Sequence, residues 1–503
     1  MNLIALLSSN TRKNSDKDCL RAGGKSYSFQ MVQGMAEKAA GLFQSLGLSK
    51  GDRIAIMSQN TVSFVVALYG AWMAGGVVVP VNHKLMPPEV DYILDHSGTK
   101  IFLFDGSLAP VADKLTAGVR KIAMDSPGGT HDRFESLMES ATPFTPVEIG
   151  DDDLAEILYT SGTTGKPKGC MHTHRGVVMS GMTGVIATKM DEDDRLLMAM
   201  PLWHSSPLNN WFAGIQYVGG TTVLIREYHP LHFLQTVQQE KCTIYFGAPI
   251  SYIMPVQMLP NFDTFDLSSM RAWIYGGGPI GADTARMIMS RYKSDRFYQV
   301  YGMTESGPTG TTLAPKDQLR KAGSIGRSGL PGCDIVIMKS ATEEAHPGEV
   351  GEIWLKADSM MNGYFKDAEA TKDVFEKGWY KTGDVARLDE DGYLFIVDRT
   401  KDMIVTGGEN VYSKEVEDTI VVCPGVAAAA VIGIPHPEWG ETVAAFIVPA
   451  KDAALDEEKI RLFLSDKLAK YKVPRTITFV ENLPYTPSGK VMKYKLREAY
   501  QKV

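Results

Sequence analysis

Apolar runs of strand length alternate with segments of helical spacing in this chain, and that alternation limits its fold more than any other feature. Residues 53–57 form a mostly apolar run, residues 63–74 have the length and composition of a buried helix, and residues 77–79 form a second apolar run. The pattern returns at residues 282–292 and 297–300. Strands that are connected through helices pair in parallel, so the sequence predicts an α/β fold with layered parallel sheets.

The pattern changes after Gly323 and again near residue 400. The first change leads into a Gly-rich segment with a good hairpin turn at Asp391-Gly392. Its strand-like runs are short and lie at residues 334–338, 352–356 and 393–397. We therefore predict two domains: residues 1–400, with layered α/β subdomains and a small β-barrel-like subdomain, and residues 401–503, a small α+β domain.

Charge and cysteine content exclude several classes of protein. The chain has 52 basic and 59 acidic residues, a net charge of −7, which argues against nucleic acid or an anionic membrane as a partner. Five scattered cysteines without a Cys-x-x-Cys pair argue against disulfides and structural zinc, and favour the cytoplasm. Residues 64–81 carry no charge but contain glycines and Pro80, so we expect a buried helix and strand there and no membrane span.

Residues 159–169, with the sequence YTSGTTGKPKG, carry the strongest chemical signal. Glycines let the backbone turn sharply and expose N–H groups, while hydroxyls and lysines add further donors, as a polyphosphate requires. The run is not a Walker A loop, because Pro167 follows Lys166 where Ser or Thr is needed. We favour a phosphate-binding loop over a flexible surface loop.

A second Gly-rich run, residues 276–281, matches the dinucleotide pattern G-x-G-x-x-G only formally. In a dinucleotide fold the acidic partner ends the second strand, whereas Asp295 precedes the strand at 297–300. We expect a turn that approaches a ligand here, and an NAD-dependent dehydrogenase stays only as an alternative from a different class.

An ordered set of segments resembles the adenylate-forming (ANL) superfamily, and above all its acyl- and aryl-CoA synthetase branch. The resemblance covers nearly the whole chain. Its segments are 60–82, 159–169, Pro-Leu-Trp-His at 201–204, 276–279, Tyr-Gly-Met-Thr-Glu at 301–305, Tyr-Lys-Thr-Gly-Asp at 380–384, 399–410 and Pro-Ser-Gly-Lys at 487–490. An ordered set of this kind is far more specific than any one of its members.

The resemblance implies a two-step reaction: ATP and a carboxylic acid give an acyl-adenylate and pyrophosphate, and CoA then displaces AMP. It implies ATP and coenzyme A as co-substrates and Mg²⁺ as cofactor, with catalytic roles for Lys490, Thr304, Glu305 and His204. Glu305 would hold the Mg²⁺ and Lys490 would bridge the carboxylate and the α-phosphate. The implied nucleotide-binding residues are Thr160, Ser161, Gly162, Thr163, Thr164, Gly165, Lys168, Gly277, Gly278, Pro279, Tyr301, Gly302, Met303, Thr304, Asp384 and Arg399.

The same resemblance implies a mobile C-terminal domain that turns at Lys401 between the two steps. Lys490 then leaves the site, and Gly407 and Gly408 line the channel for the pantetheine arm of CoA. A single Lys near a C-terminus is usually only solvated, so Lys490 depends on its matching context.

The acid itself is less constrained. Acetyl-CoA synthetases carry Trp at the position of Gly302, so we expect an acid larger than acetate: medium-chain, branched, cyclic or aromatic. Residues expected in the acyl pocket are Trp203, His204, Asn209, Tyr252, Gly276, Gly302 and Met303, although core packing accounts for Tyr252 equally well. A stand-alone enzyme that loads a carrier protein remains an alternative, and monomer and homodimer both stay open.

Several residues are expected to have no reactive role. Asp398 and Ser413 depart from the usual Gly and Pro of the superfamily, and Cys170 is expected in the core. The acidic run at residues 191–194 is expected to be a solvated turn, and the pair His172 and His174 lacks further ligands at metal spacing.

Overall fold

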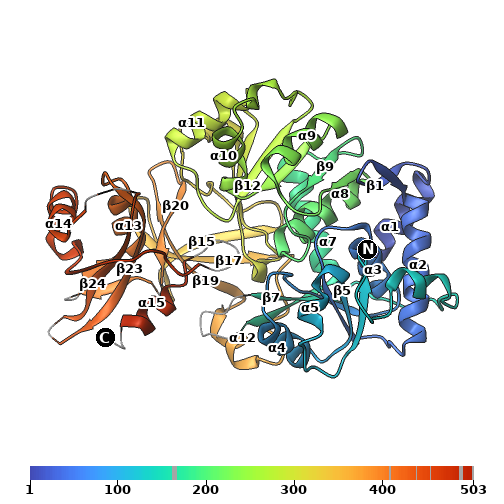
Figure 1. Ribbon diagram of the computed structural model, residues 1–503. Helices are drawn as coiled ribbons and strands as arrows, with labels where there is room; N and C mark the ends of the chain where they lie inside the picture. Colours follow the sequence, from blue (N-terminus) through green and yellow to red (C-terminus); the bar gives the residue numbers. More distant parts are fainter. Residues whose placement is uncertain are drawn as a thin grey trace. The chain divides into compact units, whose positions relative to one another are not determined.

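A computed structural model describes the chain except for residues 161–166, 401, 407–408, 438, 452, 454, 486–490 and 501–503, with residues 410 and 440 described by their backbone alone. The chain divides into two compact units, residues 1–335 with 355–380 and residues 336–354 with 381–503 (Figure 1). The predicted domain boundary at 400/401 stays a prediction, since Lys401 lies outside the described residues.

The first unit contains two largely parallel sheets. The first sheet has the strand order β14-β13-β12-β11-β9-β10-β1-β2, parallel from β13 to β1 and antiparallel at both edges. Its strands are β1 (Asp18–Ala22), β2 (Lys25–Ser28), β9 (Arg195–Met198), β10 (Thr221–Leu224), β11 (Ile244–Gly247), β12 (Ala272–Gly276), β13 (Phe297–Tyr301) and β14 (Thr311–Leu313). The second sheet has the order β6-β5-β3-β4-β7-β8, parallel except for β7 with β8. Its strands are β3 (Arg53–Met57), β4 (Val77–Pro80), β5 (Thr99–Asp105), β6 (Arg120–Met124), β7 (Leu154–Thr160) and β8 (Lys168–Thr173).

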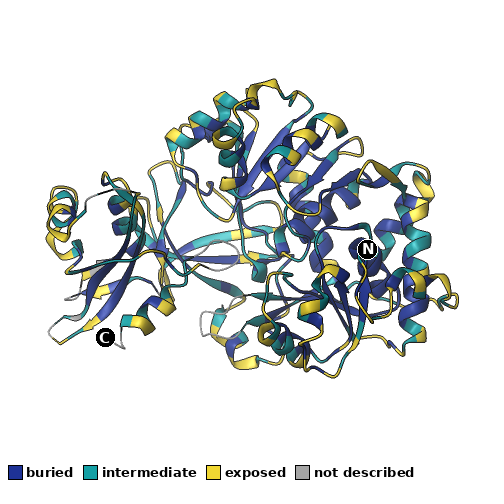
Figure 2. Cartoon of the chain, in the orientation of Figure 1, coloured by how far each residue is buried: buried dark blue, intermediate teal, exposed yellow. Residues whose placement is uncertain are grey.

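Helices cover both faces of these sheets, as the burial pattern along β3 shows. Ile54 and Ile56 face a core shared by both sheets, whereas Ala55 and Met57 face a separate core under α4 and α5. Such alternation with both faces apolar is typical of a buried parallel strand. The helices of this unit are α1 (Leu3–Lys13), α2 (Phe29–Ser45), α3 (Val62–Met73), α4 (Pro87–Ser97), α5 (Ala109–Ala112), α6 (Phe134–Glu139), α7 (His174–Thr188), α8 (Ala213–Val218), α9 (Pro230–Glu240), α10 (Pro249–Met258), α11 (Ala282–Arg291) and α12 (Ala368–Val374). The predicted layered α/β fold is confirmed, and Figure 2 shows the strands buried between partly exposed helices.

The uncharged segment 64–81 forms the buried helix α3 and the buried strand β4, as predicted. Thr61 caps the helix by accepting the Phe64 N–H at 3.1 Å, and Gly75 ends it with φ +83°. Over the described part of the chain, no helix combines the length and the apolar character that a membrane span requires.

A small antiparallel sheet follows in sequence, as expected from its Gly-rich composition. Its order is β16-β15-β17-β19-β18, with β20 on β19, and Asp391-Gly392 lies in the β19–β20 turn. Its strands are β15 (Cys333–Ser340), β16 (Glu343–Glu344), β17 (Val350–Ala357), β18 (Phe375–Glu376), β19 (Trp379–Leu388) and β20 (Leu394–Arg399). The division between the two compact units passes through this sheet.

The second unit also holds a mixed sheet with helices on both faces. Its order is β22-β21-β24-β23, with β25 parallel to β24. The elements are β21 (Ile404–Thr406), β22 (Glu409–Val411), β23 (Val426–His436), β24 (Gly440–Pro449), β25 (Thr476–Phe479), α13 (Ser413–Val421), α14 (Glu457–Ser465) and α15 (Lys493–Tyr500). Val443 faces a core with α13 and α14, and its neighbour Ala444 faces Leu496 of α15. The predicted α+β pattern after residue 400 is thus confirmed.

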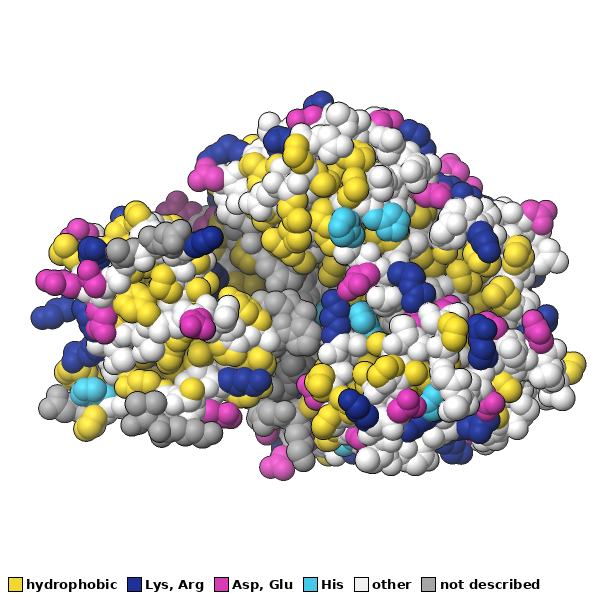
Figure 3. All heavy atoms as spheres, in the orientation of Figure 1, with side chains coloured by type: hydrophobic (Ala, Val, Ile, Leu, Met, Phe, Trp, Pro, Cys, Tyr) yellow, Lys and Arg dark blue, Asp and Glu magenta, His cyan; other side chains and the backbone are white. Residues whose placement is uncertain are grey.

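The cysteines and the surface charges follow the composition of the chain. All five cysteines are described and free, and Cys170 is fully buried, as expected. Figure 3 shows basic and acidic side chains interspersed on the visible face of the first unit, in keeping with the small net charge.

Candidate active site

The hydroxyl- and glycine-rich run connects two strands of a hairpin. Strands β7 and β8 pair antiparallel up to Thr160 and Lys168, and the Thr160 hydroxyl donates to the Lys168 carbonyl at 3.5 Å. Ser161, Gly162, Thr163, Thr164 and Gly165 lie outside the described residues. The run therefore connects the end of β7 to the start of β8. A strand that ends just before the run was predicted from the sequence.

Helix α4 contacts both flanks of this connection, which the sequence did not suggest. The Tyr92 hydroxyl donates to the Pro167 carbonyl at 3.1 Å, and His96 Nδ1 lies 2.8 Å from the Tyr159 hydroxyl. Burial lowers the pKa of His96, so its ring is neutral near pH 7 and can share a hydrogen bond with the phenol.

The Tyr301–Glu305 segment continues from β13 into a short 3₁₀ turn, η4 (Thr304–Ser306). The Met303 N–H donates to the Ser306 hydroxyl at 3.2 Å, which closes the turn. The hydroxyl oxygens of Thr304 and Ser205 are 3.1 Å apart. Thr304 is thus held from a second segment of the chain.

Glu305 and Lys168 both contact one tyrosine. The Tyr364 hydroxyl donates to Glu305 Oε1 at 3.0 Å, and Lys168 Nζ lies 5.0 Å from the centroid of the Tyr364 ring. Tyr380 hydrogen-bonds to Tyr364, and burial raises the pKa of both hydroxyls, which keeps them neutral donors. A carboxylate and an ammonium group are therefore placed together at the end of the hairpin.

This arrangement fits a hard divalent cation that is held mainly by its substrate. Among the described residues no cluster of three His, Cys, Asp or Glu side chains could hold a metal. Mg²⁺ commonly takes one or two carboxylates together with phosphate oxygens and water, and Glu305 can supply the carboxylate.

The Gly-rich run 276–281 forms an open turn after β12. Gly277 has φ +81°, which favours glycine, and a Cβ on Gly277 or Gly278 would meet no atom within 4 Å. Pro279 follows at once. The predicted turn is present and leaves this backbone open, and the approach of a ligand to it stays a prediction.

Gly302 has a packing role that the sequence did not reveal. A Cβ at this position would lie 2.2 Å from the Pro308 carbonyl oxygen and 3.2 Å from the Thr309 nitrogen. Backbone packing alone therefore requires glycine here, so the absence of a larger side chain says less about the acyl pocket than we expected.

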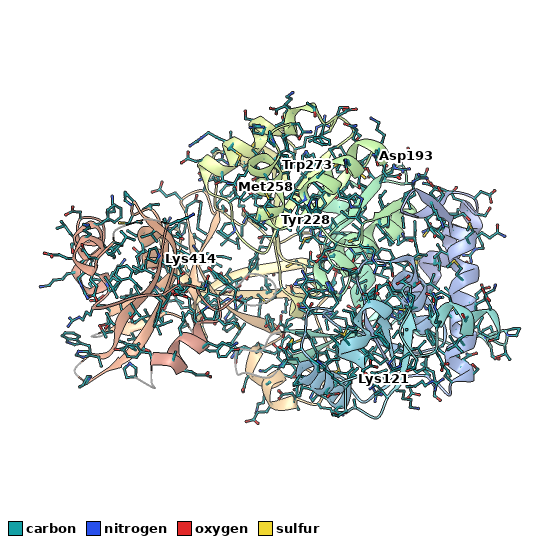
Figure 4. All side chains as sticks on the ribbon, in the orientation of Figure 1. Lys121, Asp193, Tyr228, Met258, Trp273 and Lys414 are labelled. Atoms are coloured by element: carbon teal, nitrogen blue, oxygen red, sulfur yellow. The ribbon has the colours of Figure 1, made fainter. Side chains whose placement is uncertain are left out.

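The residues expected in the acyl pocket occupy different environments. Trp203 donates its indole N–H to His83 at 3.1 Å, and its ring lies beside that of His204. Asn209 is fully buried and bonds to Glu156. Tyr252 donates to the Ile274 carbonyl at 2.5 Å and lies in the same core as Trp273, which is labelled in Figure 4. These contacts match the core-packing account of Tyr252, and its pocket role stays a prediction.

In the second unit, Asp384 and Arg399 face each other across β19 and β20. Arg399 Nε lies 3.0 Å from Asp384 Oδ1, and the Asp384 side chain is only 8% exposed. The pair can present a fixed carboxylate, as ribose hydroxyls require. Lys401, Gly407, Gly408 and Lys490 lie outside the described residues.

Asp398 and Ser413, the two departures from the superfamily pattern, contact each other. The Ser413 N–H donates to Asp398 Oδ2, and its hydroxyl donates to Asp398 Oδ1 at 3.0 Å. Lys493 of α15 donates to the same hydroxyl at 2.6 Å, and Arg497 bonds to Asp402 at 2.9 Å. Proline has no N–H to donate, so the two departures depend on one another.

The acidic run at residues 191–194 forms the predicted exposed turn over residues 191–193, but the expectation is wrong for Asp194. Asp194 is not solvated: it is 2% exposed and accepts hydrogen bonds from Arg271 Nε at 2.6 Å and Thr243 at 2.7 Å. His172 and His174 are both buried as well. The Asp194 partners directly precede β11 and β12, far along the chain, which the local sequence could not indicate.

Comparison with known proteins places this geometry in context. The profile of the family described as "AMP-binding enzyme" matches residues 7–365, and that of "AMP-binding enzyme C-terminal domain" matches residues 415–490. The chain is 36% identical to a feruloyl-CoA synthase of Amycolatopsis sp, over 97% of each chain. It is also 36% identical to the long-chain-fatty-acid–CoA ligase FadD13 of Mycobacterium tuberculosis, over 94% of this chain and 93% of that one. Its structure resembles the o-succinylbenzoate CoA synthetase MenE of Bacillus subtilis in complex with its acyl-adenylate intermediate, with TM-score 0.88, 28% identity and coverage of 98% and 97%.

Proposed function

The chain belongs to the AMP-binding enzyme family, and we propose that it is an ATP- and Mg²⁺-dependent acyl-CoA ligase acting through an acyl-adenylate. One observation supports the site assignment above others. Lys168, at the end of the β7–β8 hairpin, and Glu305, in η4, meet around Tyr364. A cation and a carboxylate at one place suit the phosphates of ATP and the Mg²⁺ that accompanies them.

In the first half-reaction a carboxylate oxygen of the acid attacks the α-phosphorus of ATP, and the bond to the β-phosphate breaks. Thr160 and Lys168 hold the β- and γ-phosphates, and Thr304 holds the α-phosphate through its hydroxyl. Glu305 would hold Mg²⁺, which would supply charge neutralisation for the leaving pyrophosphate. Lys490 places a positive charge between the carboxylate and the α-phosphate.

The adenosine half of ATP is held by the remaining residues. Tyr301 and the open backbone of Gly277 and Gly278 line the adenine, and Asp384 with Arg399 holds the ribose hydroxyls. In the second half-reaction the CoA sulfur attacks the acyl carbon, the thiol proton is lost to solvent and AMP departs. The C-terminal domain turns at Lys401 between these steps, and Gly407 and Gly408 line the path of the thiol.

The acid is larger than acetate: medium-chain, branched, cyclic or aromatic. Support comes from the relatives, whose names give ferulic acid and long-chain fatty acids as their acids. Gly302 no longer supports this assignment, because backbone packing accounts for it. As part of the same proposal we place the enzyme in the cytoplasm.

The test is pyrophosphate–ATP exchange over a panel of carboxylic acids, with and without CoA, using wild type, Lys490→Ala and the control Lys495→Ala. Lys495 is exposed on α15, a few residues beyond Lys490. We expect Lys490→Ala to lose adenylation by about a hundredfold or more while it still forms thioester from supplied acyl-adenylate. Equal loss of both steps would contradict its role.

The panel also separates the alternatives. Acyl transfer to a carrier protein without CoA would replace the CoA assignment. Thermal stabilisation by NAD(H), with none by MgATP, would reject the ligase altogether.

A further inference from the structure

A buried polar group of three residues lies beside the Thr304–Glu305 segment. Of the three, only Asn209 has a predicted role above, in the acyl pocket, and its side chain is instead buried against Glu156. Glu156 on β7 and His172 on β8 are direct cross-strand partners. The Asn209 amide donates to Glu156 Oε1 at 2.7 Å. None of these residues is more than 1% exposed. We call these three residues the Glu156 cluster.

The Glu156 cluster is not fully satisfied by its own contacts. Glu156 Oε2 and Asn209 Oδ1 have no hydrogen-bond partner among the described residues. Buried polar atoms without partners destabilise a fold, and apolar side chains at these positions would avoid that cost. Packing alone therefore does not explain why these residue types occur here.

The first link to the site runs along β8. Cross-strand pairs on one face of the hairpin follow each other in steps of two residues: Glu156 with His172, Leu158 with Cys170, and Thr160 with Lys168. The cluster thus lies on the face of the hairpin that carries Lys168.

The second link is the contact of His172 with η4. Backbone groups of Thr304 and Ser359 lie against its buried ring. Ser359 in turn donates its hydroxyl to the Ser306 carbonyl at 2.6 Å. His172 therefore supports the turn that carries Thr304 and Glu305 at two points.

The third link runs through Asn209. It lies in η2 (Ser206–Phe212), a π-helical turn that begins directly after Ser205. Ser205 is the residue whose hydroxyl lies 3.1 Å from that of Thr304. The hydrogen bond from Asn209 to Glu156 fixes η2, and η2 places Ser205 against Thr304. Single π-helical turns of this kind occur frequently at functional sites.

From these contacts we propose that the Glu156 cluster positions Thr304 and Glu305 for ATP. Glu156, His172 and Asn209 act as positioning residues through the backbone of η4 and through Ser205, without touching substrate. The inference rests on the proposed function, because it concerns the residues assigned there to the α-phosphate and to Mg²⁺.

The test compares His172→Leu, Asn209→Leu and the conservative His172→Gln with wild type. The matched control is Thr188→Val, which removes a buried hydroxyl at the end of α7 that, among the described residues, bonds only to the Gly184 carbonyl of its own helix. Pyrophosphate–ATP exchange gives kcat and KM for MgATP and for the acid, and thermal unfolding with and without MgATP gives stability and nucleotide binding separately.

We expect the two Leu variants to lose about tenfold to a hundredfold in kcat/KM for MgATP, with KM for the acid within about twofold of wild type. His172→Gln should recover part of the loss, and Thr188→Val should lose none. If the Leu variants change only the unfolding temperature and keep wild-type kcat/KM for MgATP, the cluster is merely structural and the inference is overturned.

Failure of the proposed function gives a different result. In that case wild type exchanges no pyrophosphate with any acid, and MgATP-induced stabilisation decides the inference alone. The inference is overturned if MgATP stabilises wild type and the Leu variants equally, or stabilises none of them. It is supported if MgATP stabilises wild type but not the Leu variants.

Discussion

Glu156→Gln should stabilise the protein above neutral pH and have little effect in acid. Burial raises the pKa of Glu156 from 4.5 to about 7, against the opposing hydrogen bond from Asn209. The folded state therefore holds this proton more tightly than the unfolded state, and stability falls as the pH rises from 4.5 to 7. The raised pKa of Glu156 corresponds to about 3 kcal/mol of folding stability, which is lost as the pH rises through about 7 and is fully present below pH 4.5.

Glutamine resembles the protonated acid in shape but cannot ionise, so the variant escapes this loss. Its amide can donate to Asn209 Oδ1, which has no partner among the described residues. His172, the cross-strand neighbour, does not compensate for the charge, since burial lowers its pKa to about 4 and leaves it neutral above that pH. The stability difference between variant and wild type should grow by about 2 to 3 kcal/mol from pH 5 to pH 8.

The measurement is thermal unfolding of the full chain at pH 5, 6, 7 and 8. At about 2 cal/mol/K per residue, a unit of several hundred residues should show a melting-temperature difference that widens by about 3 °C over that range. The control is Glu139→Gln, which changes an exposed glutamate at the end of α6 and should give a constant difference. A Glu156→Gln difference that is the same at pH 5 and pH 8 would refute the reasoning.

Three further predictions follow from single contacts. Gly302→Trp should lower the unfolding temperature and the adenylation rate for all acids alike, because its Cβ would meet the Pro308 carbonyl oxygen at 2.2 Å; a clean shift of preference toward acetate would contradict this. Ser413→Pro, at the first position of α13, should lower the free energy of chemical unfolding by about 2 kcal/mol, because buried Asp398 loses two hydrogen-bond donors. Proline itself is tolerated at this helix position. An unchanged free energy of unfolding would show that the pair contributes nothing to stability. Glu305→Gln should raise the Mg²⁺ concentration needed for half-maximal pyrophosphate exchange by about tenfold or more, and an unaltered Mg²⁺ titration would remove its metal role.

The sequence predicted those parts of the fold that follow from local pattern. Residues 53–57 have the same bounds as β3, because strands buried on both faces require continuous apolar runs. The hairpin turn that the Asp391-Gly392 pair predicted lies between β19 and β20. Both features depend on neighbours in sequence, so the sequence alone suffices for them.

Features that depend on distant segments could not be predicted in the same way. Asp194 was expected to be solvated because its neighbours are acidic, yet its partner Arg271 is 77 residues away. Gly302 was interpreted as leaving room for a larger acid, whereas the fold brings the Pro308 backbone against it. The partnership of Glu156 with Asn209 across 53 residues likewise has no local signal.

The hydrogen bonds between Asp398 and Ser413 join the chain before Lys401 to the chain after it. If Lys401 is the pivot, these bonds must open each time the terminal domain reorients, whereas the Arg497–Asp402 pair lies wholly beyond it and can travel intact. The rate of the step between adenylate formation and thioester formation then depends on breaking the hydrogen bonds between Asp398 and Ser413, which contact neither substrate. Substitutions at Asp398 or Ser413 could therefore change the turnover number without altering the affinity for any reactant.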